Sequence, residues 1–498
     1  MSLRQALRIA LVLFLLFPFI FLLTQFSVHG MPEWGELAWA FKNSFLQAFF
    51  SAVFSILLGL WAGLGILSFS AQGRRKHYRY ILEVLCLLPN FLPPLFVLLA
   101  TLNVIDPFPM GIIGIVIVHT LINFGLAAVL LANLIENKVG GVVELCYVEG
   151  VSRTRFLFQG LLPMLKKDLW HLGLFIFVVC FGSFSVPLIV GGGRGTTVEV
   201  LIYEKIRLSS DWSHAVVLAL LQSAFIFALS MYSGKGKALN KGRIANLNLI
   251  RMRSGVVLIT AVTLMYVVGY GEGIIAGLGM ISTFYELQSA LLWSFAGSIA
   301  IGLATGGLCY MGLLLIAYCW PKLWFEKFLG GYVAPSTSLA CFAYLILGPN
   351  EGINPYIKIP LALTLLSLNN LFRMGWDGEL HALQSQWTVA YSMGASHRQI
   401  FKEILFPQLS TRAGVLAGIA SVWACGDFAV SRILAHRDLS LAMMTETLMS
   451  SYRLNQASVL SLLIAVSGLI CFAICNMSRN YKAKIHRSEE HTSELQSH

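Results

Sequence analysis

Long apolar runs separated by short polar connections form the main pattern of this chain. A helix needs about 20 consecutive apolar residues to cross the hydrocarbon core of a bilayer. By that measure the pattern predicts about twelve membrane-spanning helices, at residues 9–28, 45–70, 81–102, 111–135, 169–191, 214–233, 255–270, 288–319, 329–348, 359–372, 411–431 and 456–476. The predicted fold class is therefore an all-α polytopic membrane protein.

The composition points the same way. Of the 498 residues, 57% are hydrophobic and only 12% are charged, against about 45–50% apolar and about 25% charged in soluble domains. So few charges could not cover a soluble body of this size with polar groups. A soluble enzyme, a disordered chain and a nucleic-acid-binding module are therefore excluded. The nine cysteines form no C-x-x-C pair, so neither a zinc site nor a disulfide framework is predicted.

The net charge of +11 reflects how the basic residues are distributed. With a cytoplasmic N-terminus, 27 of the 35 Lys and Arg residues fall on the inner side, including Arg74, Arg75 and Arg79. Cytoplasmic connections carry such an excess, so both termini are predicted to be cytoplasmic.

The first run follows Arg4 and Arg8 and lacks a small-residue cleavage site. It is predicted to be a retained helix rather than a signal peptide.

The two halves of the sequence resemble each other at a fixed offset. Several residues recur 244 positions later, namely Tyr147 and Tyr391, Gly150 and Gly394, Ser152 and Ser396, Leu161 and Leu405, and Pro163 and Pro407. The same offset relates Gly182-Ser183-Phe184 to Gly426-Asp427-Phe428. The repeat predicts two parallel six-helix halves, residues 1–245 and 246–480, related by an axis along the membrane normal. Residues 481–498 are a polar tail that we predict to be disordered or non-native.

Both copies of the repeated segment, residues 144–163 and 388–407, fall in long inner connections. Each is predicted to form two helical pieces, because its glycine supplies the positive φ of a bend and its proline suits a first helical turn. Apolar residues between these two positions are predicted to form one face: Phe156, Leu157, Leu161, Leu162, Ile400, Phe401, Ile404 and Leu405. Such an element either lies on the lipid surface or docks into a groove of a cytoplasmic partner. Two equally spaced copies favour a partner with two equivalent sites.

The spacing of Glu144, Gly150 and Pro163 resembles the EAA loop of ABC importer permeases, although the second copy has Thr388 where the family usually has Glu. The resemblance implies the type I ABC importer permease fold, whose coupling helices contact a cytoplasmic ABC ATPase dimer. It assigns that contact to Glu144, Gly150, Ser152, Pro163, Thr388, Gly394, Ser396 and Pro407. It also implies a bacterial inner membrane location and a periplasmic substrate-binding protein as a second partner.

Other stretches resemble the fused two-half permeases that serve thiamine or ferric iron. Those resembling the thiamine branch are His119-x3-Asn123, residues 180–184, 191–193 and 196–199, whereas Gly426-Asp427-Phe428 is shared with the iron group. The resemblance therefore implies import of a small solute, either thiamine or Fe(III).

The chain lacks an energy-converting signature of its own. The phosphate-binding pattern G-x4-G-K-[ST] is absent from the sequence. We therefore predict a transport subunit, not an enzyme, which binds no metal or cofactor and relies on ATP and Mg²⁺ used by a partner. The alternative is a secondary active transporter with twelve spans, a class that generally places ionisable residues within its spans.

Four polar residues are candidates for the substrate path: Asp427, Ser183, His119 and Asn123. Ionisable groups within membrane spans are functional candidates by default, and the Asp427 carboxylate would balance a cationic substrate such as thiamine. His119 and Asn123 share one face of a helix at i, i+4 spacing. The alternative for these residues is interhelical hydrogen bonding, which commonly joins spans.

Overall fold

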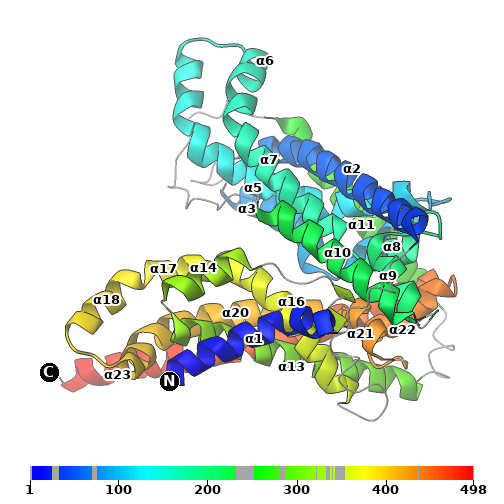
Figure 1. The fold of residues 1–498 in the computed structure, drawn as a ribbon. Helices are drawn as coiled ribbons and strands as arrows, with labels where there is room; N and C mark the ends of the chain where they lie inside the picture. The colour runs from blue at the N-terminus through cyan, green and yellow to red at the C-terminus, as the bar shows by residue number, and fades with distance from the viewer. Residues whose placement is uncertain are drawn as a thin grey trace. The chain divides into compact units, whose positions relative to one another are not determined.

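The computed structural model describes residues 3–24, 33–69, 76–207, 209, 211–231, 252–279, 288–320, 322–332, 337–338, 340–341, 354–435 and 437–496. The regular elements in these ranges are all helices, and the ranges contain no strand (Figure 1). The all-α fold class is confirmed for them. The predicted span at 329–348 and the ends of those at 9–28, 45–70 and 214–233 lie partly outside the described residues.

Six of the described helices are long and apolar enough to cross a membrane. They are Leu3–Phe21, Trp34–Ile66, Ile112–Val139, Arg253–Leu278, Gln288–Cys319 and Leu454–Asn476, and each overlaps a predicted span. A bent pair, Lys76–Asn90 and Pro94–Val104, would add a seventh crossing. Its two helices meet at 97° beside Pro93, because proline restricts the residue before it and cannot donate a helical hydrogen bond. The complete set of twelve spans stays a prediction.

The chain forms two compact units. The N-unit comprises Phe26–Ile281 and Glu446–Val459, and the C-unit comprises Met1–Gln25, Ser282–Thr445 and Leu460–His498. Each unit therefore includes a helix from beyond its own predicted half. Helix α1 (Leu3–Thr24) belongs to the C-unit, and α11 (Arg253–Leu278) belongs to the N-unit. The division of the sequence at residue 245 is a prediction about the repeat and not about these packing units.

In the N-unit, the long helix α2 (Trp34–Ile66) packs against α5 (Ile112–Val148), α7 (Leu162–Phe181) and α11. The bent pair α3 (Lys76–Phe91) and α4 (Pro94–Val104) packs on α5 and α11, and α9 (Val198–Arg207) packs on α10 (Trp212–Met231). The buried side of α2 carries mainly small residues: Ala40, Ser44, Ala48, Ser51, Ala52, Ser55, Gly59, Ala62 and Gly63. Small side chains let neighbouring backbones approach closely within a membrane.

In the C-unit, α13 (Gln288–Cys319) packs against α1, α16 (Pro355–Leu371) and α20 (Phe406–Cys425). Two arginines of α1 satisfy carbonyl groups at the end of α13. Arg8 Nε donates to Cys319 O at 2.8 Å, and Arg4 donates to Trp320 O. Because the last carbonyls of a helix have no partner within it, cationic donors there stabilise the helix end.

Helix boundaries recur along the chain at nearly the offset found in the sequence. Helices α7 and α20 are 244 residues apart at both ends, and so are α8 (Ser185–Val190) and α21 (Ala429–Leu434). The next helices, α9 and α22 (Leu441–Ser450), are 243 residues apart at both ends. Helices α10 and α23 (Leu454–Gln496) begin 242 residues apart, and α23 is helical through most of the predicted polar tail.

Two predicted spans are wrong in their limits. Hydropathy predicts single helices at 169–191 and 411–431, but α7 ends at Phe181 and α20 ends at Cys425. Gly182 and Gly426 follow, each interrupting the helix before a short second one. Both α7 and α20 also begin earlier than predicted, because Pro163 and Pro407 lie in their first turns, where proline is well tolerated.

The helices that lead to the two repeated loops differ. Helix α5 runs without a break for 37 residues, from Ile112 to Val148. In the second half, α16 is followed by the π-helical turn η3 (Phe372–Trp376), α17 (Asp377–Ala382) and α18 (Gln384–Ser392). The break lies at Met374 and Gly375, whose backbone is not helical and where Gly375 has a φ of 114°.

Candidate functional site

The first repeated loop joins α5 to α7 through the short helix α6 (Arg153–Arg155) and the π-helical turn η2 (Phe156–Leu161), and Figure 1 shows α5 and α7 as two arms of one hairpin. Helix α5 ends in a Schellman motif. Gly150 N donates to Tyr147 O at 3.2 Å, and Val151 N donates to Cys146 O at 2.9 Å. Gly150 has a φ of 67°, and a Cβ added there would meet nothing within 4 Å. The glycine is therefore needed for its left-handed backbone and not for space.

The second loop repeats this geometry at the end of α18. Gly394 N donates to Tyr391 O and Ala395 N donates to Ala390 O, both at 3.1 Å. Gly394 has a φ of 83° and open space around its Cα. The predicted positive φ is thus confirmed at both glycines, and the four backbone hydrogen bonds match pairwise at the 244-residue offset.

The serines that follow the glycines occupy N-cap positions. Ser396 forms a capping box with Gln399 at the start of α19 (His397–Ile400). Ser152 precedes α6 with the same extended backbone but makes no side-chain capping bond. Pro163 and Pro407 follow the π-helical turns η2 and η4 (Phe401–Leu405). The predicted loop residues therefore take matching positions in both copies.

A histidine ties the second loop to the membrane helices of the C-unit. The Nε2 atom of His397 lies 2.7 Å from Tyr318 O, near the end of α13. Burial lowers the pKa of His397, so at neutral pH the uncharged imidazole donates its Nε2 hydrogen to that carbonyl. Together with Arg4 and Arg8, the loop thus completes the cap of α13.

The predicted apolar face of the loops does not point outward, and that expectation is wrong. Phe156 and Leu161 are buried and pack with the α5 residues Ile135, Val139 and Val143. In the second copy, Ile400 and Leu405 are buried in the core of the C-unit, with Phe401 and Ile404 packed against it. Helical spacing identified an apolar face correctly, but the first copy packs that face onto α5, and the second packs it into the core of the C-unit, where Phe401 contacts Tyr318 of α13.

The exposed apolar residues lie instead on the arm before each glycine. We call them the loop tips: Leu145, Tyr147 and Val148 in the first copy, and Val389, Tyr391 and Met393 in the second. Val148 and Met393 are each 81% exposed. The resemblance to the EAA loop assigns the ATPase contact to Thr388, at the position that Glu144 holds in the first copy. The Thr388 hydroxyl donates to Gln384 O within its own helix. Part of this signal was available in the sequence, because Leu145 and Tyr147 recur as the apolar or aromatic residues Val389 and Tyr391 at the same offset, whereas Val148 and Met393 do not correspond.

Three of the four predicted substrate-path residues come together in the N-unit. His119 Nδ1 lies 2.9 Å from Gln47 Oε1, and its Nε2 lies 3.1 Å from Ser183 Oγ. Asn123 Nδ2 donates to His119 O at 2.8 Å, and Gln47 Nε2 donates to Cys180 O at 2.7 Å. His119, Gln47 and Asn123 are buried, whereas Ser183 is partly exposed. This buried cluster joins α2, α5 and the break between α7 and α8.

Asp427 lies in the C-unit, at the corresponding break between α20 and α21. Its Oδ2 accepts a hydrogen bond from Val430 N at 2.9 Å, and its carbonyl accepts one from Ser431 Oγ at 3.1 Å. The carboxylate therefore closes the first turn of α21, as acidic groups do at helix starts. The structure does not bring Asp427 together with the His119 cluster in one unit.

Sequence reasoning missed Gln47, the residue that joins the cluster to α2. Its neighbours on the same face contact the segment after α8, where Asn43 Nδ2 donates to Thr196 O at 3.1 Å and Val198 N donates to Ser44 Oγ at 2.9 Å. Polar residues at i, i+4 spacing inside an apolar run were the available signal. Within the described ranges, no group of three or more His, Cys, Asp or Glu side chains could hold a metal ion.

Comparison with known proteins identifies the relatives of this chain. Residues 332–480 match the family model described as "Binding-protein-dependent transport system inner membrane component". The thiamine transport system permease proteins of Escherichia coli (strain K12) and Salmonella typhimurium (strain LT2) are each 24% identical, with 87% of both chains covered. The chain is similar to binding-protein-dependent ABC permeases of the thiamine type.

That similarity extends to further thiamine permeases. The protein of Brucella abortus (strain 2308) is 24% identical over 74% of this chain and 71% of its own length. No solved structure matches the chain. The relatives and the apolar helices together indicate a multi-pass inner membrane transport subunit rather than an enzyme.

The buried cluster gives a first testable prediction. Replacing Gln47 by leucine leaves His119 Nδ1 and Cys180 O without their partner, which we expect to lower the free energy of unfolding by about 1–3 kcal/mol. Thermal unfolding in detergent measures this loss. Ser51→Ala, one turn further along α2, is the matched control, because the buried Ser51 hydroxyl has no hydrogen-bond partner among the described residues. Equal losses for both variants would contradict the role of the cluster.

Proposed function

We propose that this chain is the transmembrane permease subunit of an ABC importer and that it moves thiamine into the cytoplasm. The observation that carries the proposal is the similarity to thiamine permeases over 87% of the chain. The two loops with matching backbone hydrogen bonds support it, since a dimeric ATPase would offer two equivalent docking sites.

In this proposal the fold has twelve spans in two parallel halves, with both termini in the cytoplasm. A periplasmic binding protein delivers the substrate to the outer face. ATP-driven closure of the ATPase dimer moves loops 144–163 and 388–407 together, and the halves rock to alternate access. Gly150 and Gly394 set the bend of each loop, and Ser152, Ser396, Pro163 and Pro407 set the helix starts. Glu144 and Thr388 directly precede the loop-tip residues Leu145 and Val389 and contribute to the contact with the ATPase.

For the substrate path, we propose that the His119–Gln47–Asn123 cluster fixes the break at Gly182–Phe184. Ser183 is then the partly exposed member that meets the substrate. Asp427 occupies the corresponding break in the second half, where a carboxylate would balance the positive charge of the thiazolium ring.

Reconstitution tests this function. The chain is placed in proteoliposomes with a cytoplasmic ABC ATPase and a thiamine-binding protein that copurify with it, and uptake of labelled thiamine is measured. We expect uptake that requires ATP, the ATPase and the binding protein, with no uptake of Fe(III). Uptake driven by an ion gradient without the ATPase would instead indicate a secondary transporter. Uptake of Fe(III) but not thiamine would contradict the substrate assignment.

The loop tips give a second prediction. We expect Tyr147→Ala with Tyr391→Ala to reduce copurification of the ATPase about tenfold, since exposed aromatic residues dominate many interfaces. Thermal stability of the permease is expected to change little, because these side chains are 44% and 60% exposed. Tyr78→Ala with Tyr80→Ala is the matched control, as these α3 residues are 59% and 63% exposed. Equal loss of the ATPase in both pairs would argue against docking at the tips.

A further inference from the structure

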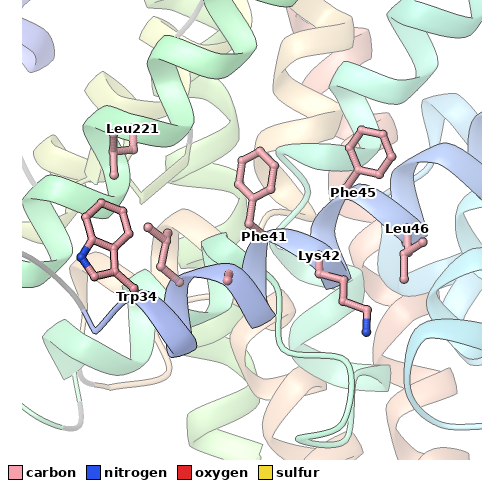
Figure 2. A pocket seen from close by; sticks show the side chains of 8 residues that line it. Trp34, Phe41, Lys42, Phe45, Leu46 and Leu221 are labelled. Atoms are coloured by element: carbon pink, nitrogen blue, oxygen red, sulfur yellow. The ribbon is translucent and has the colours of Figure 1, made fainter.

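A groove with apolar walls runs along the outward side of α2 in the N-unit. It encloses about 600 Å³ and is lined by eight residues: Trp34, Leu37, Ala38, Phe41, Lys42, Phe45, Leu46 and Leu221 of α10. Figure 2 shows Phe41 and Phe45 projecting to one side of α2 and Lys42 to the other. The buried residues of α2, including Asn43, Ser44 and Gln47, are different ones. The groove therefore lies on the side of α2 that is exposed within the N-unit.

Lys42 is the one charged residue in this apolar surface. The nearest acid along α2 is Glu36, whose carboxylate is 2.8 Å from Lys205 Nζ of α9. The hydrogen bond to Glu36 raises the pKa of Lys205, so that pair is complete. Among the residues that the structure describes, none forms an ion pair with the exposed Lys42. An ammonium is costly within the hydrocarbon and extends to the membrane interface, where water and anionic headgroups can solvate it.

The length of α2 allows Lys42 to lie at that interface. Its 33 residues extend about 50 Å at 1.5 Å per residue, whereas the hydrocarbon core is about 30 Å thick. Part of the helix must therefore lie at headgroup level. Lys42 is about 12 Å along the helix from Trp34, and tryptophan and lysine are both typical of this boundary. Phe45 and Leu46 follow Lys42 toward the apolar region, and Phe41 lies beside Lys42 at the same level of the helix.

We propose that this groove binds an anionic phospholipid, with its phosphate on Lys42 and an acyl chain along Phe41, Phe45 and Leu46. Charge selects the occupant, since a zwitterionic lipid would fill the same apolar walls but interact less favourably with the ammonium. The ligand comes from the surrounding bilayer, because the walls of the groove are apolar and would not hold a free anion. This site is separate from the loops and from the His119 cluster, so it does not depend on the proposed function.

Lipid titration of the detergent-purified full chain tests the proposal. Binding of phosphatidylglycerol and phosphatidylcholine is followed by native mass spectrometry and by thermal unfolding. We expect phosphatidylglycerol to bind about fivefold more tightly, as one surface lysine contributes roughly this much to anionic lipid binding. Lys42→Gln should abolish the preference and Lys42→Arg should keep it. Lys402→Gln, an exposed lysine on the second loop, should leave it unchanged.

A second variant tests the contribution of the groove's shape to lipid binding while leaving the charge of Lys42 unchanged. Ala38→Trp fills the groove and should weaken binding of both lipids while the lipid-free melting temperature stays close to that of the parent. Any of three results would overturn the proposal: no preference for phosphatidylglycerol in the parent chain, an unchanged preference in Lys42→Gln, or undiminished binding in Ala38→Trp. Equal protection by inorganic phosphate would also overturn it, since the ligand would then be a free anion.

Discussion

Replacing Gly150 and Gly394 together by proline is expected to abolish stimulation of the partner ATPase and thiamine uptake. Proline fixes φ near −65° and has no N–H, whereas the two glycines have φ of 67° and 83° and donate to Tyr147 O and Tyr391 O. Each substitution therefore conflicts with the bend and removes a hydrogen bond, a combination worth about 3 kcal/mol or more. We expect the stimulated ATPase rate to fall about tenfold or more, because the tips before each glycine lose their orientation.

Alanine variants at the same two glycines are expected to reduce ATPase stimulation less than the proline variants do. Gly150→Ala and Gly394→Ala keep the N–H and change only the backbone preference, which costs about 1–2 kcal/mol in the left-handed region, so partial loss of stimulation is expected. Gly141→Ala and Gly378→Ala are the controls, since both glycines are helical and an added Cβ meets nothing within 4 Å. They should retain full activity. Binding-protein-stimulated ATPase activity that survives the double proline variant would rule out docking through these loops.

The loop bends were predictable from the sequence because their causes are local. A glycine three residues after a tyrosine and a proline thirteen residues later specify a positive φ and a helix start wherever the segment lies in the fold. The recurrence of Gly150 and Gly394 at one offset added a second, independent signal. The same reasoning applies to the kink beside Pro93, where the covalent geometry of proline leaves few alternatives.

Features that depend on packing could not be predicted this way. An apolar face at helical spacing does not say which surface covers it, so the pattern predicts that Phe156 and Ile400 face outward, although both are buried. Hydropathy alone also extended two spans across Gly182 and Gly426, where the helices end. Helix α1 belongs to the C-unit because Leu11 and Leu15 pack in its core and Arg4 and Arg8 meet carbonyls more than 300 residues away. No local pattern encodes these contacts.

Replacing Arg79 by methionine is expected to have the largest effect on stability. The buried guanidinium of Arg79 on α3 makes a bidentate contact with Glu136 on α5, at 3.2 and 2.8 Å, and donates to Glu83 Oε1 at 2.9 Å. Removing one partner of a buried ion pair leaves the other charge without compensation, at a cost of about 3–5 kcal/mol. Unfolding by denaturant in mixed micelles measures the loss. Lys138→Met is the control, because the Lys138–Asp168 pair is more exposed and should contribute at most about 1 kcal/mol.

The second half of the chain indicates how this loss can be recovered. At the 244-residue offset, Glu136 corresponds to Leu380, which is 1% exposed and packs in the core of the C-unit. An apolar residue at this position is therefore compatible with a helix leading to the loop. We expect Glu136→Leu to restore most of the stability of Arg79→Met, since buried pairs can often be replaced by apolar residues. If the free energy of unfolding lost in the double variant equals the sum of the losses in the two single variants, the ion pair is not the source of the loss.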